Sequence, residues 1–216
     1  MKKLIIILSL VSAIFLGGCS ESVPNTRGVY MLMDTSGTYT QELEQAQRVI
    51  NYILANLDPG DSFAVARVDT ASFSEKDIIA KVAFDDRPSR ANQQKRDFRD
   101  KIDKFVKSVK ASSYTDITGG TLQAIEWLTE AGTGRNTILI FSDLKEELGE
   151  GYKRDIAFSL KSFDVVAINV TKLRSDNYDP KEYMSRIEDW NARVVSGGGS
   201  WKVTNDMDQL EKIFIN

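Results

Sequence analysis

Short apolar runs of strand length alternate with helical patterns of apolar residues along most of this chain. The most apolar run, residues 29–33, is continuous rather than alternating, which is typical of a strand buried on both faces, and 137–141 is the next most apolar. Partly alternating runs predict further strands at 62–69, 78–84, 165–170 and 200–203. Apolar residues at helical spacing predict helices at about 41–56, 91–109, 121–130, 153–161 and 181–193, and a final helix capped by Asn205 or Asp206.

The order of these elements predicts the fold class. The link between the runs at 62–69 and 78–84 is too short for a helical crossover, so these two strands should pair antiparallel. The second of them carries Lys81, a charge that discourages sheet-to-sheet association, and we expect it at an edge. The other strands alternate with helices. The sequence therefore predicts one α/β domain over residues 28–216, with a doubly wound, mostly parallel sheet, one antiparallel edge strand and helices on both faces.

The first residues have the pattern of a secretory signal. Two lysines at 2–3 precede an almost wholly apolar stretch at 4–16, which is shorter than the roughly 20 residues of a membrane span and fits a signal-peptide core. The tetrad that follows, Leu16-Gly17-Gly18-Cys19, resembles a bacterial lipobox. The alternative is an uncleaved signal anchor with an incidental cysteine.

The lipobox resemblance implies a division of the N-terminal region. Residues 1–18 would be removed as a signal peptide, Cys19 would carry the lipid, palmitate included, and 19–27 would form a lipidated tether. Several acyl chains hold a protein firmly at a membrane, whereas a single chain gives only marginal binding. Because Ser20 rather than aspartate follows the cysteine, the resemblance also implies a place in the bacterial cell envelope, at the outer membrane facing the periplasm.

Composition excludes several kinds of site. The chain has no histidine, which excludes Ser-His-Asp and Cys-His catalysis and any metal site built on imidazole. Its single cysteine, Cys19, excludes an internal disulfide and a thiolate zinc cluster. The formal charge of −3 and the lack of a long basic run argue against a nucleic-acid partner.

Acids and hydroxyls gather in three loops beside the most apolar strands. The three segments are Asp34-Thr35-Ser36-Gly37-Thr38, Tyr114-Thr115-Asp116-Ile117 and Phe141-Ser142-Asp143. In an open α/β sheet, ligands bind in the loops at the carboxyl ends of the strands. Carboxylate and hydroxyl oxygens that converge there suit a small, hard cation. The sequence thus predicts a cation site at this edge of the sheet.

With these three segments, the chain from about residue 28 to its end resembles the von Willebrand factor A domain. In that family a D-x-S-x-S or D-x-S-x-T motif, a threonine from a second loop and an aspartate from a third form a metal-ion-dependent adhesion site (MIDAS). The resemblance implies that Ser36 and Thr38 coordinate Mg²⁺ or Mn²⁺ directly and that Thr115 binds it directly or through water. It implies that Asp34 and Asp143 act mainly through water or by holding the hydroxyls.

Three features depart from the family pattern or compete with these assignments. Thr118 is a near competitor of Thr115. Leu144 stands where the family often has glycine. The acids Glu146 and Glu147 follow closely, and either is a candidate internal ligand for the open position on the metal, which would weaken partner binding.

The function implied by the resemblance is that of a binding module and not an enzyme. Mg²⁺ keeps several waters in a near-octahedral shell, so neutral hydroxyls and outer carboxylates leave an electrophilic open position. A carboxylate from another envelope or surface protein would fill that position, and the lipid at Cys19 would hold the module to the membrane.

Two other functions use the same residues. An apolar strand followed by D-x-x-G-T also resembles the nucleophile loop of haloacid-dehalogenase-like phosphatases, in which Asp34 would attack phosphorus and Ser142 would match the second motif. Against it, Ser36 stands where a general acid is expected, and the strand at 165–170 lacks the acidic pair that should follow. The other alternative function is that of a structural envelope scaffold with a vestigial metal site.

Overall fold

The computed structural model describes residues 24–37, 42–69, 73–110, 112–173, 175–206 and 209–210. The strands are β1 (Arg27–Met33), β2 (Ser62–Arg67), β3 (Ile78–Ala83), β4 (Arg135–Phe141), β5 (Phe163–Ile168) and β6 (Ser200–Thr204). The helices are α2 (Leu43–Asn56), α3 (Pro88–Ser108), α4 (Ile117–Ala131) and α5 (Pro180–Ser196), with short 3₁₀ turns η3 (Glu75–Asp77) and η4 (Ser175–Asn177).

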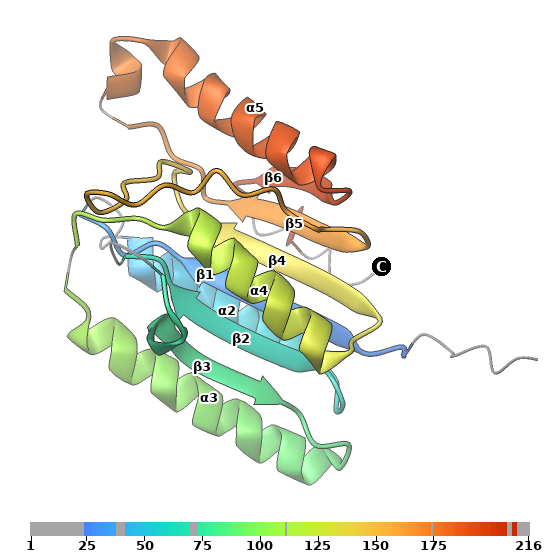
Figure 1. The fold of residues 1–216 in the computed structure, drawn as a ribbon. Coiled ribbons are helices and arrows are strands. Elements are labelled where there is room, and N and C mark those ends of the chain that lie inside the picture. Colours follow the sequence, from blue (N-terminus) through green and yellow to red (C-terminus); the bar gives the residue numbers. More distant parts are fainter. Residues whose placement is uncertain are drawn as a thin grey trace, which may run out of the picture.

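The strands form one sheet in the order β3-β2-β1-β4-β5-β6 (Figure 1). All neighbouring strands run parallel except β2 and β3, which pair antiparallel at the edge. Strand β1 lies at the centre of the sheet, between β2 and β4. The chain adds β2 and β3 on one side of β1 and then β4, β5 and β6 on the other. The predicted fold class, mostly parallel with one antiparallel edge strand, is confirmed.

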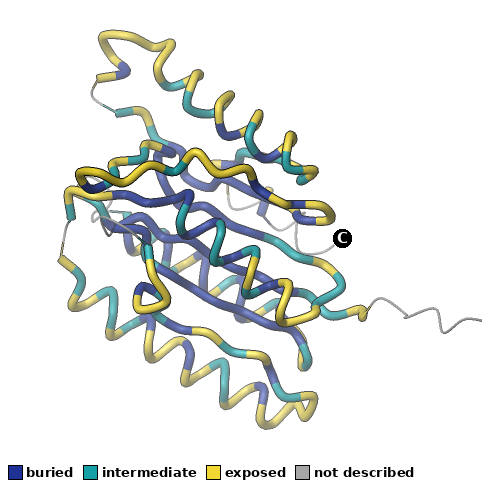
Figure 2. The backbone as a smooth tube through the Cα atoms, in the orientation of Figure 1, coloured by how far each residue is buried: buried dark blue, intermediate teal, exposed yellow. Residues whose placement is uncertain are grey.

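Helices cover both faces of this sheet, and alternate residues of β1 face the two layers. Val29, Met31 and Met33 pack in one apolar cluster with residues of α2 and α3. Tyr30 and Leu32 pack in a second cluster with residues of α4 and α5. Figure 2 shows the result, with buried strands between helices whose outer faces are exposed. A strand that is apolar at every position is explained by this double cover.

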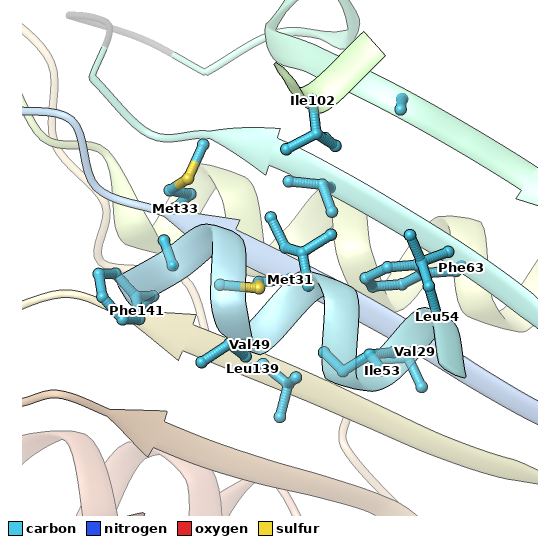
Figure 3. Packing of buried hydrophobic residues seen from close by; sticks show 14 of the residues in the cluster. Val29, Met31, Met33, Val49, Ile53, Leu54, Phe63, Ile102, Leu139 and Phe141 are labelled. Carbon is cyan, nitrogen blue, oxygen red and sulfur yellow. The ribbon is translucent and has the colours of Figure 1, made fainter. Parts of the chain in front are cut away.

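The layer beneath α2 is close-packed. Val49 and Ile53 of α2 lie over Met31 of β1 and Leu139 of β4, and all four are fully buried (Figure 3). Burying each such side chain contributes roughly 1.5–3 kcal/mol relative to leaving it in water. This packing fixes β1 and β4 side by side, and both strands end at the same edge of the sheet.

The helix predicted at 153–161 is wrong. Residues 153–160 have no regular secondary structure and connect β4 to β5 in an irregular path. Phe158 and Leu160 are buried, two positions apart, whereas Ile156 is 47% exposed. Phe158 stacks on Trp190 of α5, with ring centroids 6.0 Å apart. The apolar side chains are therefore buried by contact with α5, a tertiary effect that overrides the local helical pattern.

Helix α4 begins four residues before its predicted start. Gly119 and Gly120 weaken a helical pattern, because glycine loses more backbone entropy than other residues. The structure compensates through Asp116, whose side chain caps the helix by accepting a hydrogen bond from the Gly119 amide at 2.8 Å. Gly120 also allows close packing, since a Cβ there would lie 2.8 Å from the Leu32 Cδ2 atom.

The N-terminal signal and lipidation predictions, including Cys19, lie outside the described residues. Of the final helix, residues 209–210 are described, and Leu210 is buried against the α2 layer. Within the described ranges no helix is long and apolar enough to cross a membrane.

Candidate metal-binding site

The loops that follow β1 and β4 are adjacent because the strands are in register. Met33 of β1 pairs with Phe141 of β4, and the next amide, that of Asp34, donates to the Phe141 carbonyl at 2.9 Å. Asp34 and Ser142 therefore leave the sheet side by side. The hydroxyl of Ser142 donates to Oδ2 of Asp34 at 2.8 Å, which joins the two loops through their side chains.

Backbone pairing ties the remaining loop to both. Ser36 forms an isolated parallel bridge with Ser112, and the Gly37 amide donates to the Ser112 carbonyl at 3.0 Å. Thr115 forms an antiparallel bridge with Glu147, with both N–H···O distances below 3.0 Å. The three loops predicted from the sequence thus meet at one edge of the sheet, where hydrogen bonds hold their backbones together.

These loops enclose a cavity of about 300 Å³, which we call the site hollow. Its lining consists of Ser36, Gly37, Ser112, Ser113, Thr115, Asp143, Lys145, Glu147 and Leu173. Three of the five predicted metal residues, Ser36, Thr115 and Asp143, are among them. Asp34 is fully buried next to the hollow, and Thr38 lies outside the described residues.

Asp34 is held by hydrogen bonds on both carboxylate oxygens. Oδ1 accepts from the Ser36 amide at 2.8 Å, and Oδ2 accepts from the Ser142 hydroxyl. Burial raises the pKa of Asp34 above its ordinary value, and the hydrogen bonds from Ser36 and Ser142 oppose that rise. Because both oxygens are engaged, this carboxylate is placed to orient the neighbouring hydroxyls.

Asp143 lies at the hollow itself and is only 4% exposed. Its Oδ1 atom accepts a hydrogen bond from the Lys145 amide at 2.9 Å. Burial raises the pKa of Asp143 to about 6, with a further contribution from the negative charge of Asp34, whereas the Lys145 amide lowers it. A cation in the hollow would replace the proton that this environment favours.

Leu144, which stands where the von Willebrand factor A family often has glycine, has a backbone conformation that favours glycine. Leu144 has a φ of 68°, in the left-handed region that glycine adopts freely and leucine rarely does. Its side chain is 3% exposed within the α4 and α5 layer, and its carbonyl accepts from the Trp190 indole at 3.3 Å. These contacts help to hold Leu144 in this backbone conformation.

Thr118, the competitor of Thr115, does not line the site hollow. Its amide and hydroxyl donate to the carboxylate of Glu146 at 2.6 and 2.9 Å. Arg193 of α5 donates to the Thr118 hydroxyl at 2.7 Å and to Glu146 at 3.3 Å. Thr118 and Glu146 therefore belong to a separate network, and of the two acids predicted as internal ligands only Glu147 lines the hollow.

An ion pair at the hollow was not predicted from the sequence. Lys145 Nζ lies 2.6 Å from Glu147 Oε1, and both side chains are about half exposed. The neighbouring Glu147 carboxylate raises the pKa of Lys145 above its ordinary value. The available signal was a lysine two positions before Glu147, but only the loop path shows that these two side chains face the same cavity.

Two buried arginine–carboxylate pairs support the loops from outside, and sequence reasoning missed both. Asp116 accepts from Arg154 at 2.7 Å and from the Phe73 amide at 2.7 Å. Burial opposes ionisation of Asp116, but Arg154 and the backbone donors hold its pKa below the usual range. Arg186 of α5 pairs with both oxygens of Asp176 and donates to the carbonyl of Asp143 at 3.1 Å.

The donor atoms define which cations the hollow suits. Among the described residues, no group of three or more acidic, histidine or cysteine side chains is arranged to hold a metal ion. A cation here would depend on the hydroxyl oxygens of Ser36 and Thr115 together with the carboxylate of Asp143. An all-oxygen set with few charges fits Mg²⁺ or Mn²⁺, which accept hydroxyl and water ligands, and does not fit softer ions.

Comparison with known proteins gives the fold. No protein-family model matches the sequence, and no curated protein matches it either. A solved von Willebrand factor type A protein from Catenulispora acidiphila superposes with a TM-score of 0.54 at 16% identity, over 88% of this chain and 41% of that one. The pilus adhesin SpaC from Lactobacillus rhamnosus GG superposes with a TM-score of 0.52 at 10% identity, over 93% of this chain and 30% of that one.

This chain thus spans less than half the length of the two solved chains it superposes on. Identities this low establish shared architecture and no more. The fold of this chain, a mostly parallel six-stranded sheet with one antiparallel edge strand and helices on both faces, is of the von Willebrand factor A type.

Proposed function

We propose that this protein is a non-enzymatic binding module that takes Mg²⁺ or Mn²⁺ at the site hollow and, through that cation, a carboxylate of a partner protein. The observation that carries the proposal is the convergence of Ser36, Thr115 and Asp143, from three separate loops, on one cavity. When bound, the cation would supply an electrophilic position for an anionic oxygen. The side chains of the chain itself would hold the cation on one side and leave its remaining positions to water and to the carboxylate of the partner.

The surroundings of the hollow favour this role. Asp34 and the backbone bridges fix the three loops before any ligand arrives, so little ordering is required on binding. The hollow is open to solvent on one side, as a protein ligand requires. SpaC, one of the solved structures on which this chain superposes, is described as a pilus adhesin, and the proposal gives this chain a binding role of that general kind.

The geometry of Asp34 counts against the phosphatase alternative. A nucleophilic carboxylate must reach the phosphorus atom, yet Asp34 is fully buried and both of its oxygens accept hydrogen bonds. The residue two positions further is a serine, which is a poor general acid at neutral pH. Hydrolysis of p-nitrophenyl phosphate by the wild type, abolished in Asp34→Asn, would restore that alternative.

The test of metal binding is isothermal titration of the full-length protein, in a non-ionic detergent, with Mg²⁺ and with Mn²⁺. We expect a saturable heat in the wild type and a loss of at least tenfold in affinity for Ser36→Ala. Ser185→Ala, on the exposed face of α5, is the matched control and should behave as the wild type. Equal heats for the wild type and Ser36→Ala would remove the metal from the proposal.

The test of the partner is capture from detergent-solubilised envelopes with and without a chelator. If a metal bridges the carboxylate of the partner to this protein, capture of the partner should fail in the presence of the chelator. It should also fail with the Ser36→Ala variant. Capture that survives both changes would favour the structural scaffold, in which the metal site is vestigial.

We also propose that a lipid on Cys19 holds the protein in the bacterial cell envelope, at the outer membrane facing the periplasm. The lipobox resemblance supports it. Mass spectrometry of the N-terminal peptide should show a diacylglyceryl and an acyl group on Cys19, and Cys19→Ser should release the protein from membranes. A soluble wild-type protein with an unmodified cysteine would contradict this part.

A further inference from the structure

A second cavity, of about 600 Å³, lies between η3, the start of β3 and the C-terminal half of α3. Five basic residues line it: Arg67, Lys76, Lys101, Lys104 and Lys110. Asp77 is the one acid in its lining, and its walls include the apolar side chains of Phe105 and Val109. We call this cavity the basic groove.

The lysines of the basic groove are not balanced by ion pairs with the described residues. Arg67 is shared between Asp69 at 3.4 Å and Asp77 at 3.5 Å. In contrast, none of the four lysines of the groove forms an ion pair with a described residue. Of the acids of α3, Asp97 accepts from Gln93 and Asp103 from Gln47 of α2, and Asp100 forms no ion pair with a described residue. Four uncompensated lysines around one cavity stand out on a chain whose formal charge is −3.

The basic groove lies at the same edge of the sheet as the site hollow. Arg67 ends β2 and pairs with Met33, the residue before Asp34, on the neighbouring strand. Lys110 lines the groove and Ser112 lines the hollow, and two residues of chain span at most about 7 Å. Ser112 is bridged to Ser36 after β1, and Arg67 ends the neighbouring strand β2, so both cavities lie at the ends of paired strands.

We propose that the basic groove binds an acidic stretch of the same partner segment whose carboxylate reaches the site hollow. This inference rests on the proposed function. The connection from Ser112 in the hollow through Lys110 to Ser108 spans at most about 14 Å, or about four residues of extended peptide, and the helical stretch from Ser108 back to Lys101 rises roughly 10 Å, or about three more. The partner therefore carries further acidic residues within about seven positions of the one that meets the metal.

The shape of the groove favours a peptide over a membrane surface. A concave channel with apolar walls at Phe105 and Val109 can receive an extended chain whose acidic side chains alternate with apolar ones. A flat layer of anionic headgroups would not reach those walls. An acidic peptide and an anionic membrane are both negatively charged, so the experiment has to distinguish between them.

The experiment measures binding of fluorescein-labelled hexaglutamate to the full-length protein by fluorescence anisotropy, with hexaglutamine as the uncharged probe. The test variant is Lys104→Gln with Lys110→Gln. The control, Lys107→Gln with Lys161→Gln, removes the same charge from exposed positions outside the groove. We expect a five- to tenfold loss of hexaglutamate affinity in the test variant and less than a twofold loss in the control.

Three results would overturn the proposal: equal losses in the two variants, the same affinity for hexaglutamine, or no hexaglutamate binding by the wild type. Groove-dependent binding of vesicles with 30% anionic phospholipid that hexaglutamate does not displace would overturn it in favour of a membrane.

Metal titrations separate this proposal from the proposed function. The test variant should keep the Mg²⁺ affinity of the wild type, because its changes lie outside the site hollow. Addition of Mg²⁺ should strengthen hexaglutamate binding by the wild type but not by Ser36→Ala. If Mg²⁺ does not bind the wild type while the groove-dependent loss remains, the metal bridge is refuted and acidic-peptide binding by the groove is supported.

Discussion

Replacing Asp34 by asparagine separates the role of this carboxylate in metal binding from its role in the fold. Asparagine has the same shape, so its Oδ1 can still accept from the Ser36 amide, as Asp34 does at 2.8 Å. Its amide nitrogen would face the Ser142 hydroxyl, whose oxygen already accepts from the Leu144 amide at 3.1 Å and has a second lone pair for the new donor. The change thus replaces an acceptor by a donor at one contact and removes a charge.

The expected effect on stability is small and depends on pH. One altered hydrogen bond is worth about 1 kcal/mol. Burial raises the folded-state pKa of Asp34, so ionisation of this group costs stability as the pH rises through that pKa. Asp34→Asn does not ionise. In a chelator its stability should therefore lie within about 1 kcal/mol of the wild type at about pH 4, near the unfolded-state pKa, and improve relative to the wild type as the pH rises to 7.5.

The expected effect on the metal is large. A group that positions metal ligands typically contributes ten- to a hundredfold to affinity, and Asp34 positions the Ser36 segment. Isothermal titration gives the Mg²⁺ affinity, and urea unfolding in a chelator gives the free energy of unfolding. Asp155→Asn, at an exposed position, is the control. Unchanged Mg²⁺ affinity together with a loss of more than about 2 kcal/mol would show that Asp34 serves the fold alone.

Two further predictions follow from buried carboxylates. Arg154→Gln leaves Asp116 buried without its cation, so it should cost about 2–4 kcal/mol at pH 7 in urea unfolding, and the exposed Lys153→Gln should cost less than about 0.5 kcal/mol. Because the folded-state pKa of Asp116 is lowered, that difference should shrink as the pH falls below about 4; a difference that persists at pH 3 would point to lost packing instead. Asp143, with its pKa raised to about 6, must lose a proton to bind a cation, so Mg²⁺ affinity should be about tenfold lower at pH 5 than at pH 7.5. In a chelator, ionisation of Asp143 should reduce the free energy of unfolding as the pH rises from about 4 to about 6. A Mg²⁺ affinity that does not depend on pH would exclude Asp143 from the site.

The strands were the part of the fold that the sequence predicted best. Residues 29–33 are apolar at every position because β1 is covered on both faces, and the short link before β3 leaves no room for a crossover helix. Both signals are local, since they depend only on burial and on chain length. The parallel order of β1 and β4 then places Asp34 beside Ser142, as the position of both at strand ends predicted.

The helix expected at 153–161 shows where local patterns fail. The apolar residues at 156, 158 and 160 lie two positions apart, and the contacts that decide their conformation come from α5, some 30 residues later in the chain. Arg154 is fixed by Asp116, 38 residues earlier. No pattern within the segment records either contact, so the irregular path could not be predicted from its own residues.

The sequence by itself determined the order and type of the strands, the edge of the sheet at which Asp34, Thr115 and Asp143 would meet, and the exclusion of histidine chemistry. Only the tertiary structure decided that Thr115 rather than Thr118 lines the site hollow, that Glu147 faces the hollow while Glu146 pairs with Arg193, and that four lysines surround one groove. The physical reason is that burial and hydrogen-bonding capacity are properties of single residues and leave periodic traces along a chain. The direction in which a loop side chain points depends on backbone paths fixed by distant contacts.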